Sequence, residues 1–369
     1  MDVFNPFFQN FLLFPFLTAF IFSFISTPFV IRLARYFELV DNPKVRKHPA
    51  HVHSHTIPRA GGLAIYFGII ISVILFFPFS KQLLGIVGGM TALIFIGLLD
   101  DKFDLNPYFR LVTNCFAALL VIGSGISIAY ITNPFGGIIH FDTLRIKFNF
   151  FGPHSIIVWA DLLALIWIVW CMNMVNWSKG VDGQMPGFTA ISAFILGILA
   201  FRFAIGGDSS QWFVVVFSFI AAGAFSGFIP FNFYPQRVMP GYGGGSLAGF
   251  ILAILAILSG AKLATAILVL GVPMVDACYT IARRMFSKRS PVWADRGHLH
   301  HKLMDLGWGK RRIALFYWLL SAILGAVSLN LNSRGKFFAI VLVGVLLGGV
   351  LLWLSFWATF SRQADRNNG

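Results

Sequence analysis

The chain has 369 residues, of which 57% are hydrophobic, 16% aromatic and only 11% charged. So little polar material excludes a separate soluble domain and predicts an all-α polytopic membrane protein in which residues 1–369 form a single embedded unit. The formal net charge of +14 indicates basic loops on one side of a bilayer and an attraction for anionic headgroups or substrates. We expect no nucleic-acid partner.

Apolar runs of about 20 residues, the length that crosses a bilayer, recur along the whole chain. Eleven transmembrane helices are predicted, near residues 11–31, 61–79, 83–99, 112–131, 155–172, 187–205, 211–230, 246–260, 262–280, 312–330 and 336–358. Lys and Arg concentrate in alternate connections, and because basic residues stay on the cytoplasmic side, we expect the N-terminus outside and the C-terminus inside. The cytoplasmic loops that would form a site are residues 32–60, 100–111, 173–186, 231–245 and 281–312.

The first of these loops contains DNPKVRKHPAHVHSHTIPRAGG, residues 41–62, and is basic and rich in histidine. Arg46 and Lys47 are candidates to grip a phosphate. Alternatively, the segment is an ordinary positive-inside connection that ends in Pro58 and a pair of glycines before the next helix. Histidines at this spacing in a loop are weak evidence for a metal site.

An apolar helix runs directly into two neighbouring carboxylates in FIGLLDDKFD, residues 95–104. Asp100 and Asp101 stand where a span reaches water, and two carboxylates this close both ionise only if a cation lies near them. One of them can therefore serve as a Mg²⁺ ligand or as a catalytic base. The alternative is that the pair merely ends a helix.

Residues 133–154 alternate apolar and polar side chains, for example Ile146 and Phe148 against Arg145 and Lys147. This period of two predicts a small β-hairpin lying on the outer membrane surface. We expect no chemistry from it.

The fifth span ends in NMVNWSKGVDGQMPG, residues 173–187. Asn173 and Asn176 are three positions apart and share one helical face, and Lys179 and Asp182 follow. Two amides and a carboxylate would suit a pyrophosphate, a ribose or Mg²⁺-bound water better than they suit a bland helix end. Further on, MPGYGGGS, residues 239–246, is either an anion-binding helix start or a flexible turn, and it lacks the ending of a P-loop.

The last long loop carries the densest polar cluster of the chain, ADRGHLHHKL at residues 294–303. Its histidines, His298, His300 and His301, lack the HExxH spacing of a metalloprotease. Together with Arg296 they suit donors to phosphate, unless the loop is only solvated. Asp276, in the span before this loop, is expected to be buried near the inner surface.

The motifs and their order resemble the polyprenyl-phosphate N-acetylhexosamine-1-phosphate transferase family over residues 25–305. The resemblance rests on DNPKVRK…IPRAGG, on LLDD at 98–101, on NxxN…DG at 173–183 and on DRGHLHHKL at 295–303. The HLHH form is more similar to the branch that starts O-antigen, teichoic-acid or enterobacterial polysaccharide synthesis than to the phospho-MurNAc-pentapeptide branch. The resemblance implies transfer of a sugar-1-phosphate from a UDP-sugar to undecaprenyl phosphate, release of UMP, a Mg²⁺ cofactor, and a site on the cytoplasmic face of a bacterial inner membrane.

Together, the resemblance and the needs of phosphoryl transfer predict roles for individual residues. The catalytic set is Asp100, Asp101 and Asp182, with Asp100 as base or as positioner of the lipid phosphate, and Asp101 and Asp182 as metal ligands around Mg²⁺. The substrate-binding set is Arg46, Lys47, Asn173, Asn176, Lys179, Arg296, His298, His300 and His301. The expected partners are a UDP-N-acetylhexosamine, undecaprenyl phosphate and the lipid bilayer, and a homodimer is left open.

Two positions depart from the family pattern. Lys179 stands where the first Asp of NxxNxxDG is usual, and Tyr242 stands where FMGDxGS has an Asp that the family uses around Mg²⁺. Either the remaining carboxylates hold the metal with Lys179 replacing part of its charge, or the chain is a catalytically inactive homologue that binds polyprenyl phosphate or the UDP-sugar. A transporter is a distant third alternative, because we see no internal repeat.

Overall fold

The computed structural model of the protein describes residues 9–43, 55–149, 153–260, 262–288, 290 and 296–367. Most of these residues form helices. They are the π-helix η1 (Gln9–Leu13), α2 (Phe14–Tyr36), α3 (Gly61–Phe76), α4 (Lys81–Phe103), α5 (Pro107–Gly123), α6 (Val158–Trp177), α7 (Gln184–Ile205), α8 (Gln211–Asn232), α9 (Gly241–Leu258), α10 (Leu263–Val269), α11 (Gly271–Phe286), α12 (Leu299–Asp305), α13 (Lys310–Asn330) and α14 (Ser333–Asn367). The strands are β1 (Val40–Asp41), β2 (Ile57–Pro58), β3 (Tyr130–Thr132), β4 (Ile138–His140), β5 (Arg145–Asn149) and β6 (Pro153–Ile157).

All eleven predicted apolar segments are helical over most of their length. By length and hydropathy, however, the described part of the chain has eight helices able to cross a membrane, or nine if one bent pair counts as a span. Helices α3 and α5 have 16 and 17 residues, which is shorter than the roughly 20 residues of a typical span. The polytopic helical class is therefore confirmed, and the count of eleven spans is not.

The predicted span over 262–280 is not one straight helix. Helices α10 and α11 meet at an angle of 84°, with Leu270 between them. Pro273 is the third residue of α11 and has no N–H to donate to the carbonyl of Val269, four residues earlier. The missing hydrogen bond explains why the helix breaks at this point.

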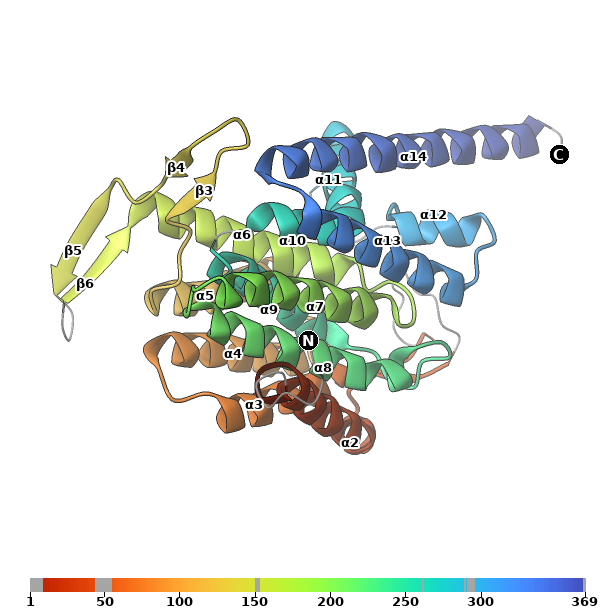
Figure 1. Cartoon of the computed structure of the whole chain (residues 1–369). Helices are drawn as coiled ribbons and strands as arrows, with labels where there is room; N and C mark the ends of the chain where they lie inside the picture. The colour runs from red at the N-terminus through yellow and green to blue at the C-terminus, as the bar shows by residue number, and fades with distance from the viewer. Residues whose placement is uncertain are drawn as a thin grey trace.

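The predicted hairpin over 133–154 is replaced by two antiparallel strand pairs. Strand β3 pairs with β4, and β5 pairs with β6; both pairs project beyond the helices in Figure 1. Strand β3 lies at the end of the predicted span 112–131, because α5 begins and ends earlier than predicted. Asn106 caps α5 by accepting a hydrogen bond from the Tyr108 N atom, and Pro107 is its first residue.

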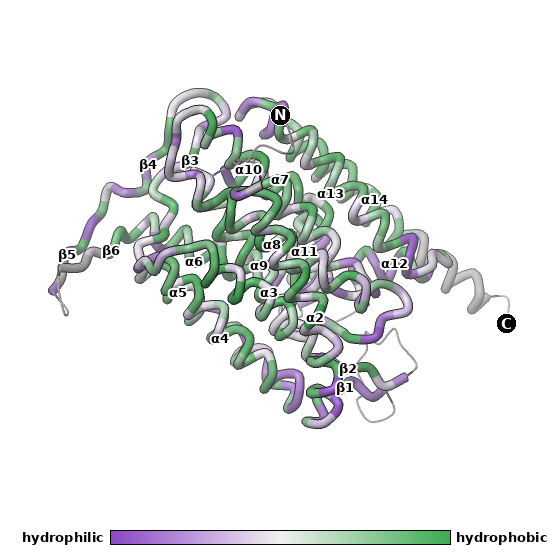
Figure 2. The backbone as a smooth tube through the Cα atoms, turned by 60° about the horizontal axis from the view of Figure 1, so that its bottom comes forward, coloured by the Kyte–Doolittle hydropathy of each residue, from purple (hydrophilic) through white to green (hydrophobic). Residues whose placement is uncertain are grey.

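Helix α9 is the centre of the bundle. Of its 18 residues, 94% are buried. The helix packs against α3, α4, α6, α7 and α8. Its first half is rich in glycine, which lets neighbouring backbones approach closely. A Cβ atom on Gly97 of α4 would overlap Gly243, and one on Gly62 of α3 would overlap Gly244. These contacts fix the polar ends of α3 and α4 against the first turn of α9, and in Figure 2 the polar end of α4 lies beside β1 and β2.

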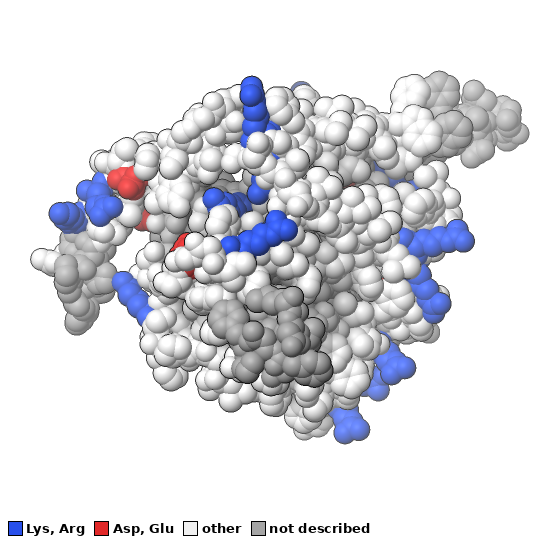
Figure 3. All heavy atoms as spheres, in the orientation of Figure 1, with Lys and Arg blue, Asp and Glu red and all other residues white. Residues whose placement is uncertain are grey.

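Two carboxylates of α4 are buried, although the face of the protein in Figure 3 is mostly basic. On the face shown in Figure 3, Lys and Arg side chains outnumber Asp and Glu side chains, as expected from the net charge of +14. Asp100 and Asp101, in contrast, are 0% and 4% exposed. The carboxylates of greatest interest are therefore inside the protein.

Candidate functional site

Two buried carboxylates at the C-terminal end of α4 form the core of the site. The Asp100 Oδ1 atom accepts hydrogen bonds from Arg110 Nε at 2.5 Å and from Leu105 N at 3.1 Å. Arg59 Nε lies 3.2 Å from Asp101 Oδ1, and a second nitrogen of the same guanidinium lies 3.9 Å from Asp100 Oδ2. Each carboxylate thus has a guanidinium beside it, which offsets the cost of burying its charge.

The two arginines were not predicted as site residues. Arg59 lies two residues before the start of α3, and Arg110 lies near the start of α5. Arg59 is the single cation of IPRAGG, and Arg110 is the single cation of LNPYFRL, residues 105–111, which follows the carboxylate pair. The signal that could have identified them is charge balance, because two carboxylates buried at a helix end need cationic partners.

Tyr242, in the first turn of α9, is a hub of the cluster. Its backbone N donates to Asp101 Oδ1 at 3.1 Å, and its hydroxyl donates to Asn114 Oδ1 at 3.0 Å. The Arg110 guanidinium lies 5.3 Å from the centre of its ring, in a cation–π contact. The glycine-rich segment is therefore a helix start that faces an anion, which was one of the two alternatives, and the anion is Asp101 of the protein itself.

Lys179 reaches into the same cluster from the loop after α6. Its Nζ atom donates to the Gly241 carbonyl at 2.7 Å and lies 5.9 Å from the centre of the Tyr242 ring. Burial lowers the pKa of Lys179 to about 7, and the neighbouring Asp101 opposes this shift. An anion that arrives beside Lys179 will favour its charged form.

The two asparagines of α6 have different surroundings. Asn173 donates from Nδ2 to the Val169 carbonyl of its own helix at 2.8 Å. The Asn176 Oδ1 atom is buried close to Gly245 and has no hydrogen-bond partner among the residues that the structure describes. An unpaired buried acceptor costs about 1–3 kcal/mol, so Asn176 is the better placed of the two to receive a donor from a ligand.

Asp182, before the start of α7, belongs to a different set of contacts. It is 2% exposed. Its Oδ1 atom lies 3.1 Å from Lys310 Nζ, and its Oδ2 atom accepts from Gln236 N at 3.2 Å. Its cationic partner is thus a lysine of α13, whereas that of Asp101 is Arg59.

The three predicted histidines lie together at the start of α12. Asp276 of α11 accepts from the Leu299 N atom at 2.7 Å, and its other oxygen lies 2.9 Å from His298 Nδ1. The rings of His298 and His300 are parallel with centres 5.7 Å apart, and those of His300 and His301 are 4.3 Å apart. Asp276 therefore both caps the helix and fixes the orientation of the first imidazole.

His300 and His301 offer neutral imidazoles rather than cations. Burial lowers the pKa of His300 well below its ordinary value and that of His301 to about 4. The Nδ1 atoms of both rings are buried and have no hydrogen-bond partner within the described part of the chain. His300 also packs against Gly180, which joins the histidines to the loop that carries Lys179.

The remaining predicted residues are peripheral or not described. The side chain of Arg296 is 51% exposed and lies 3.6 Å from Asp305. Arg46, Lys47 and Asp295 lie outside the described residues. Their roles remain predictions.

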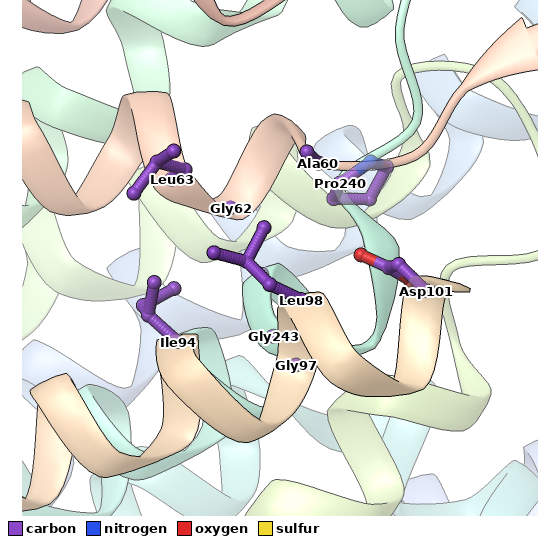
Figure 4. A pocket seen from close by; sticks show the side chains of 10 residues that line it. Ala60, Gly62, Leu63, Ile94, Gly97, Leu98, Asp101, Pro240 and Gly243 are labelled. Carbon is purple, nitrogen blue, oxygen red and sulfur yellow. The ribbon is translucent and has the colours of Figure 1, made fainter. Parts of the chain in front are cut away.

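A narrow crevice between α3, α4 and α9 ends at Asp101 (Figure 4). Of its lining residues only Asp101 is charged. The others are Ala60, Gly62, Leu63, Ile94, Gly97, Leu98, Pro240, Gly243 and Gly244. The crevice is thus formed by the apolar packing of these helices, which holds Asp101 in place.

Comparisons with known proteins cover most of the chain. Residues 83–260 match the model of glycosyl transferase family 4. A protein of Bacillus subtilis (strain 168), a probable undecaprenyl-phosphate N-acetylglucosaminyl 1-phosphate transferase, is 27% identical over 330 residues, which cover 88% of this chain and 86% of that protein. A decaprenyl-phosphate N-acetylglucosaminephosphotransferase of Mycobacterium leprae is 29% identical over 366 residues, with 90% and 87% covered. The undecaprenyl-phosphate alpha-N-acetylglucosaminyl 1-phosphate transferase of Escherichia coli (strain K12) is 27% identical over 335 residues, with 84% and 81% covered. Over residues 83–260 the chain is similar to glycosyl transferase family 4, and over most of its length it is similar to the N-acetylglucosaminyl 1-phosphate transferases named above.

The family 4 match contains much of the cluster described above. Residues 83–260 include Asp100, Asp101, Asn176, Lys179 and Tyr242. The resemblance predicted from the motifs is therefore confirmed, and both unusual positions lie within the matched region.

The donor set of the chain does not fit the Mg²⁺ ion that the resemblance implies. Mg²⁺ demands octahedral oxygen coordination and is usually held through one or two carboxylates plus waters and phosphates. Here both Oδ1 atoms of the carboxylate pair contact guanidinium groups, and Asp101 Oδ2 packs against Gly241. Within the described ranges, no three His, Cys, Asp or Glu side chains are grouped so that they could hold a metal ion.

Proposed function

We propose that the protein transfers an N-acetylhexosamine-1-phosphate group from a UDP-sugar to a polyprenyl phosphate such as undecaprenyl phosphate, with release of UMP. The observation that carries this proposal is the group of three cations, Arg59, Arg110 and Lys179, around a buried carboxylate pair in a chain similar to family 4. The names of the relatives, which are N-acetylglucosaminyl 1-phosphate transferases, support a hexosamine donor.

The reaction requires positive charge more than covalent help. An oxygen of the lipid phosphate attacks the β-phosphorus of the donor, the bond from this phosphorus to the bridging oxygen breaks, and UMP leaves with that oxygen. Fixed cations that face the transferring group stabilise such a transition state. Arg59, Arg110 and Lys179 supply these charges, and the N-termini of α3, α5 and α9 add partial positive charge close to them.

Asp100 is the best candidate to position the nucleophile. Its Oδ2 atom is buried, and the structure shows no hydrogen-bond partner for it among the described residues. This oxygen can accept a proton or a hydrogen bond from the lipid phosphate. Asp101, which is held by Arg59 and by Tyr242 N, then acts as a support that keeps the cations in place.

The polar groups without partners suit the rest of the donor. The Asn176 Oδ1 atom can accept from the uracil N–H or from a ribose hydroxyl. The neutral imidazoles of His300 and His301 can hydrogen-bond to the sugar or to the pyrophosphate, and Asp276 fixes the orientation of His298 beside them. The enzyme would in this way hold both ends of a UDP-sugar.

The position of the site at the ends of apolar helices suits a lipid acceptor. A polyprenyl tail can stay in hydrocarbon while its phosphate reaches the ends of α3, α4 and α9. We place this end of the bundle on the cytoplasmic face of a bacterial inner membrane with the N-terminus outside, because most Lys and Arg residues fall in the loops on that side.

The test is UMP release by the purified protein with undecaprenyl phosphate and a panel of UDP-N-acetylhexosamines. Turnover is expected with at least one donor, and Asp100→Asn should lower it strongly because the free carboxylate oxygen is lost. Donor binding without UMP release from any member of the panel would instead indicate an inactive homologue.

A further inference from the structure

Lys179 and Tyr242 form one unit within the carboxylate cluster. The lysine donates to the carbonyl of Gly241, the residue before Tyr242, and faces the Tyr242 ring. A carboxylate at position 179 would have no hydrogen to donate to this carbonyl, and one at position 242 would add a negative charge close to Asp101. The contacts seen here therefore require the residues that this chain has.

The cations of the protein occupy the place of a metal ion. Arg110 and Arg59 contact the Oδ1 atoms of Asp100 and Asp101. The Asp100 Oδ2 atom remains without a hydrogen-bond partner in the described part of the chain, and even it has an Arg59 nitrogen 3.9 Å away. A divalent cation that bound these carboxylates would have to displace guanidinium groups.

We infer that Lys179, together with Arg59 and Arg110, takes the place of a divalent cation, so that this chain binds the pyrophosphate of a nucleoside diphosphate sugar without a metal ion. The inference rests on the proposed function for the identity of the ligand. In the transfer step, one oxygen–phosphorus bond forms at the β-phosphorus and one breaks, and the charges balance without a proton when the lipid phosphate is a dianion. The ammonium and guanidinium groups stabilise the negative charge that moves to the leaving UMP oxygen.

The first test measures the affinity of the purified full-length protein for UDP-N-acetylglucosamine by calorimetry, once in EDTA and once in Mg²⁺. We expect the same affinity in both. In EDTA, Lys179→Met should weaken binding by about 10- to 100-fold, because a charge-assisted contact is lost. Lys81→Met is the matched control, since Lys81 is exposed at the opposite end of α4, and it should bind as the unchanged protein does. Wild-type binding that requires Mg²⁺, or unchanged binding by Lys179→Met, would overturn the inference.

The second test restores the missing carboxylates and uses Mn²⁺ as a spectroscopic probe. The unchanged protein should leave the electron paramagnetic resonance signal of free Mn²⁺ as it is, whereas the double variant Lys179→Asp, Tyr242→Asp should bind Mn²⁺. If the unchanged protein binds Mn²⁺ and Asp101→Asn abolishes this binding, the inference is wrong. This wild-type measurement decides the matter even if size-exclusion chromatography shows that the double variant does not fold.

UMP release separates the inference from the proposed function. Release that continues in EDTA supports both. Release that stops in EDTA supports the transferase and overturns the inference. If no donor gives UMP while binding in EDTA still depends on Lys179, the transferase proposal fails and the inference about donor binding stands.

Discussion

Replacing Gly97 by alanine should destabilise the protein, whereas the same change at Gly88, on the same helix, should not. Alanine favours a helix interior over glycine by up to about 1 kcal/mol. At Gly88 the new methyl group would meet only the Leu120 Cδ1 atom at 3.8 Å, which is ordinary contact. At Gly97 it would lie 2.6 Å from the Gly243 N atom and still closer to the Cα atom, and both belong to the backbone of the buried helix α9. Such overpacking costs about 1–3 kcal/mol. Because the gain in helix propensity is common to both variants, they should differ in stability by this cost, about 1–3 kcal/mol.

The assay is thermal unfolding of both variants and the unchanged protein in the same detergent. Gly88→Ala should melt at or above the wild-type temperature and Gly97→Ala clearly below it. Because Gly97 lies one turn before Asp101, its replacement should also disturb the hydrogen bond from Tyr242 N to Asp101 and lower UMP release. Equal melting temperatures for the two variants would show that α4 does not pack backbone to backbone against α9.

Two further predictions concern buried ionisable groups. Burial lowers the pKa of His301 from 6.5 to about 4. Between these two pH values the unfolded chain therefore binds more protons than the folded protein does. The free energy of unfolding should fall as the pH drops from about 6.5 to 4, by up to about 3 kcal/mol. Melting curves at pH 7 and pH 4.5 measure this loss, which should be smaller in His301→Gln; a melting temperature independent of pH would contradict it. Lys310→Met should destabilise the protein by about 1–3 kcal/mol, because Asp182 keeps its Gln236 N contact but loses its cation. The double variant Lys310→Met, Asp182→Asn should recover part of this loss in urea or thermal unfolding, and a double variant no more stable than Lys310→Met would refute the pairing.

Hydropathy predicted the helices well because burial in a bilayer depends on long apolar runs, which any window along the chain can detect. It could not separate α10 from α11, since their apolar character continues across the bend. The break depends on one missing N–H at Pro273, a local backbone effect that an average over 20 residues hides. The strands β3 to β6 were merged into one hairpin for a similar reason, because an alternating pattern does not show where one turn ends and the next begins.

The site was predicted in part. The carboxylate pair, Lys179 and the histidines stand out because charged or polar residues at the ends of apolar helices are conspicuous. Arg59 was missed because its partners lie more than 40 positions further along the chain, and contacts between distant segments cannot be read from one sequence. The glycines in the first turns of α9 were interpreted as a turn or an anion site because their role in packing appears only when the facing glycines of α3 and α4 are known.

Lys179 and Tyr242, the two departures from the family pattern, can be explained physically only when they are considered together. Relative to two aspartates, Lys179 raises the formal charge of the site by two units and Tyr242 by one, whereas Mg²⁺ contributes two. The Tyr242 ring contacts both Lys179 and Arg110, and its hydroxyl is anchored on Asn114, so one aromatic residue holds two cations at fixed places. A lysine alone has three N–H donors, of which Lys179 already directs one to the Gly241 carbonyl, whereas an octahedral ion offers six coordination positions. The planar guanidinium groups of Arg59 and Arg110 have several donors each, and for this reason the replacement of a metal ion needs all three cations.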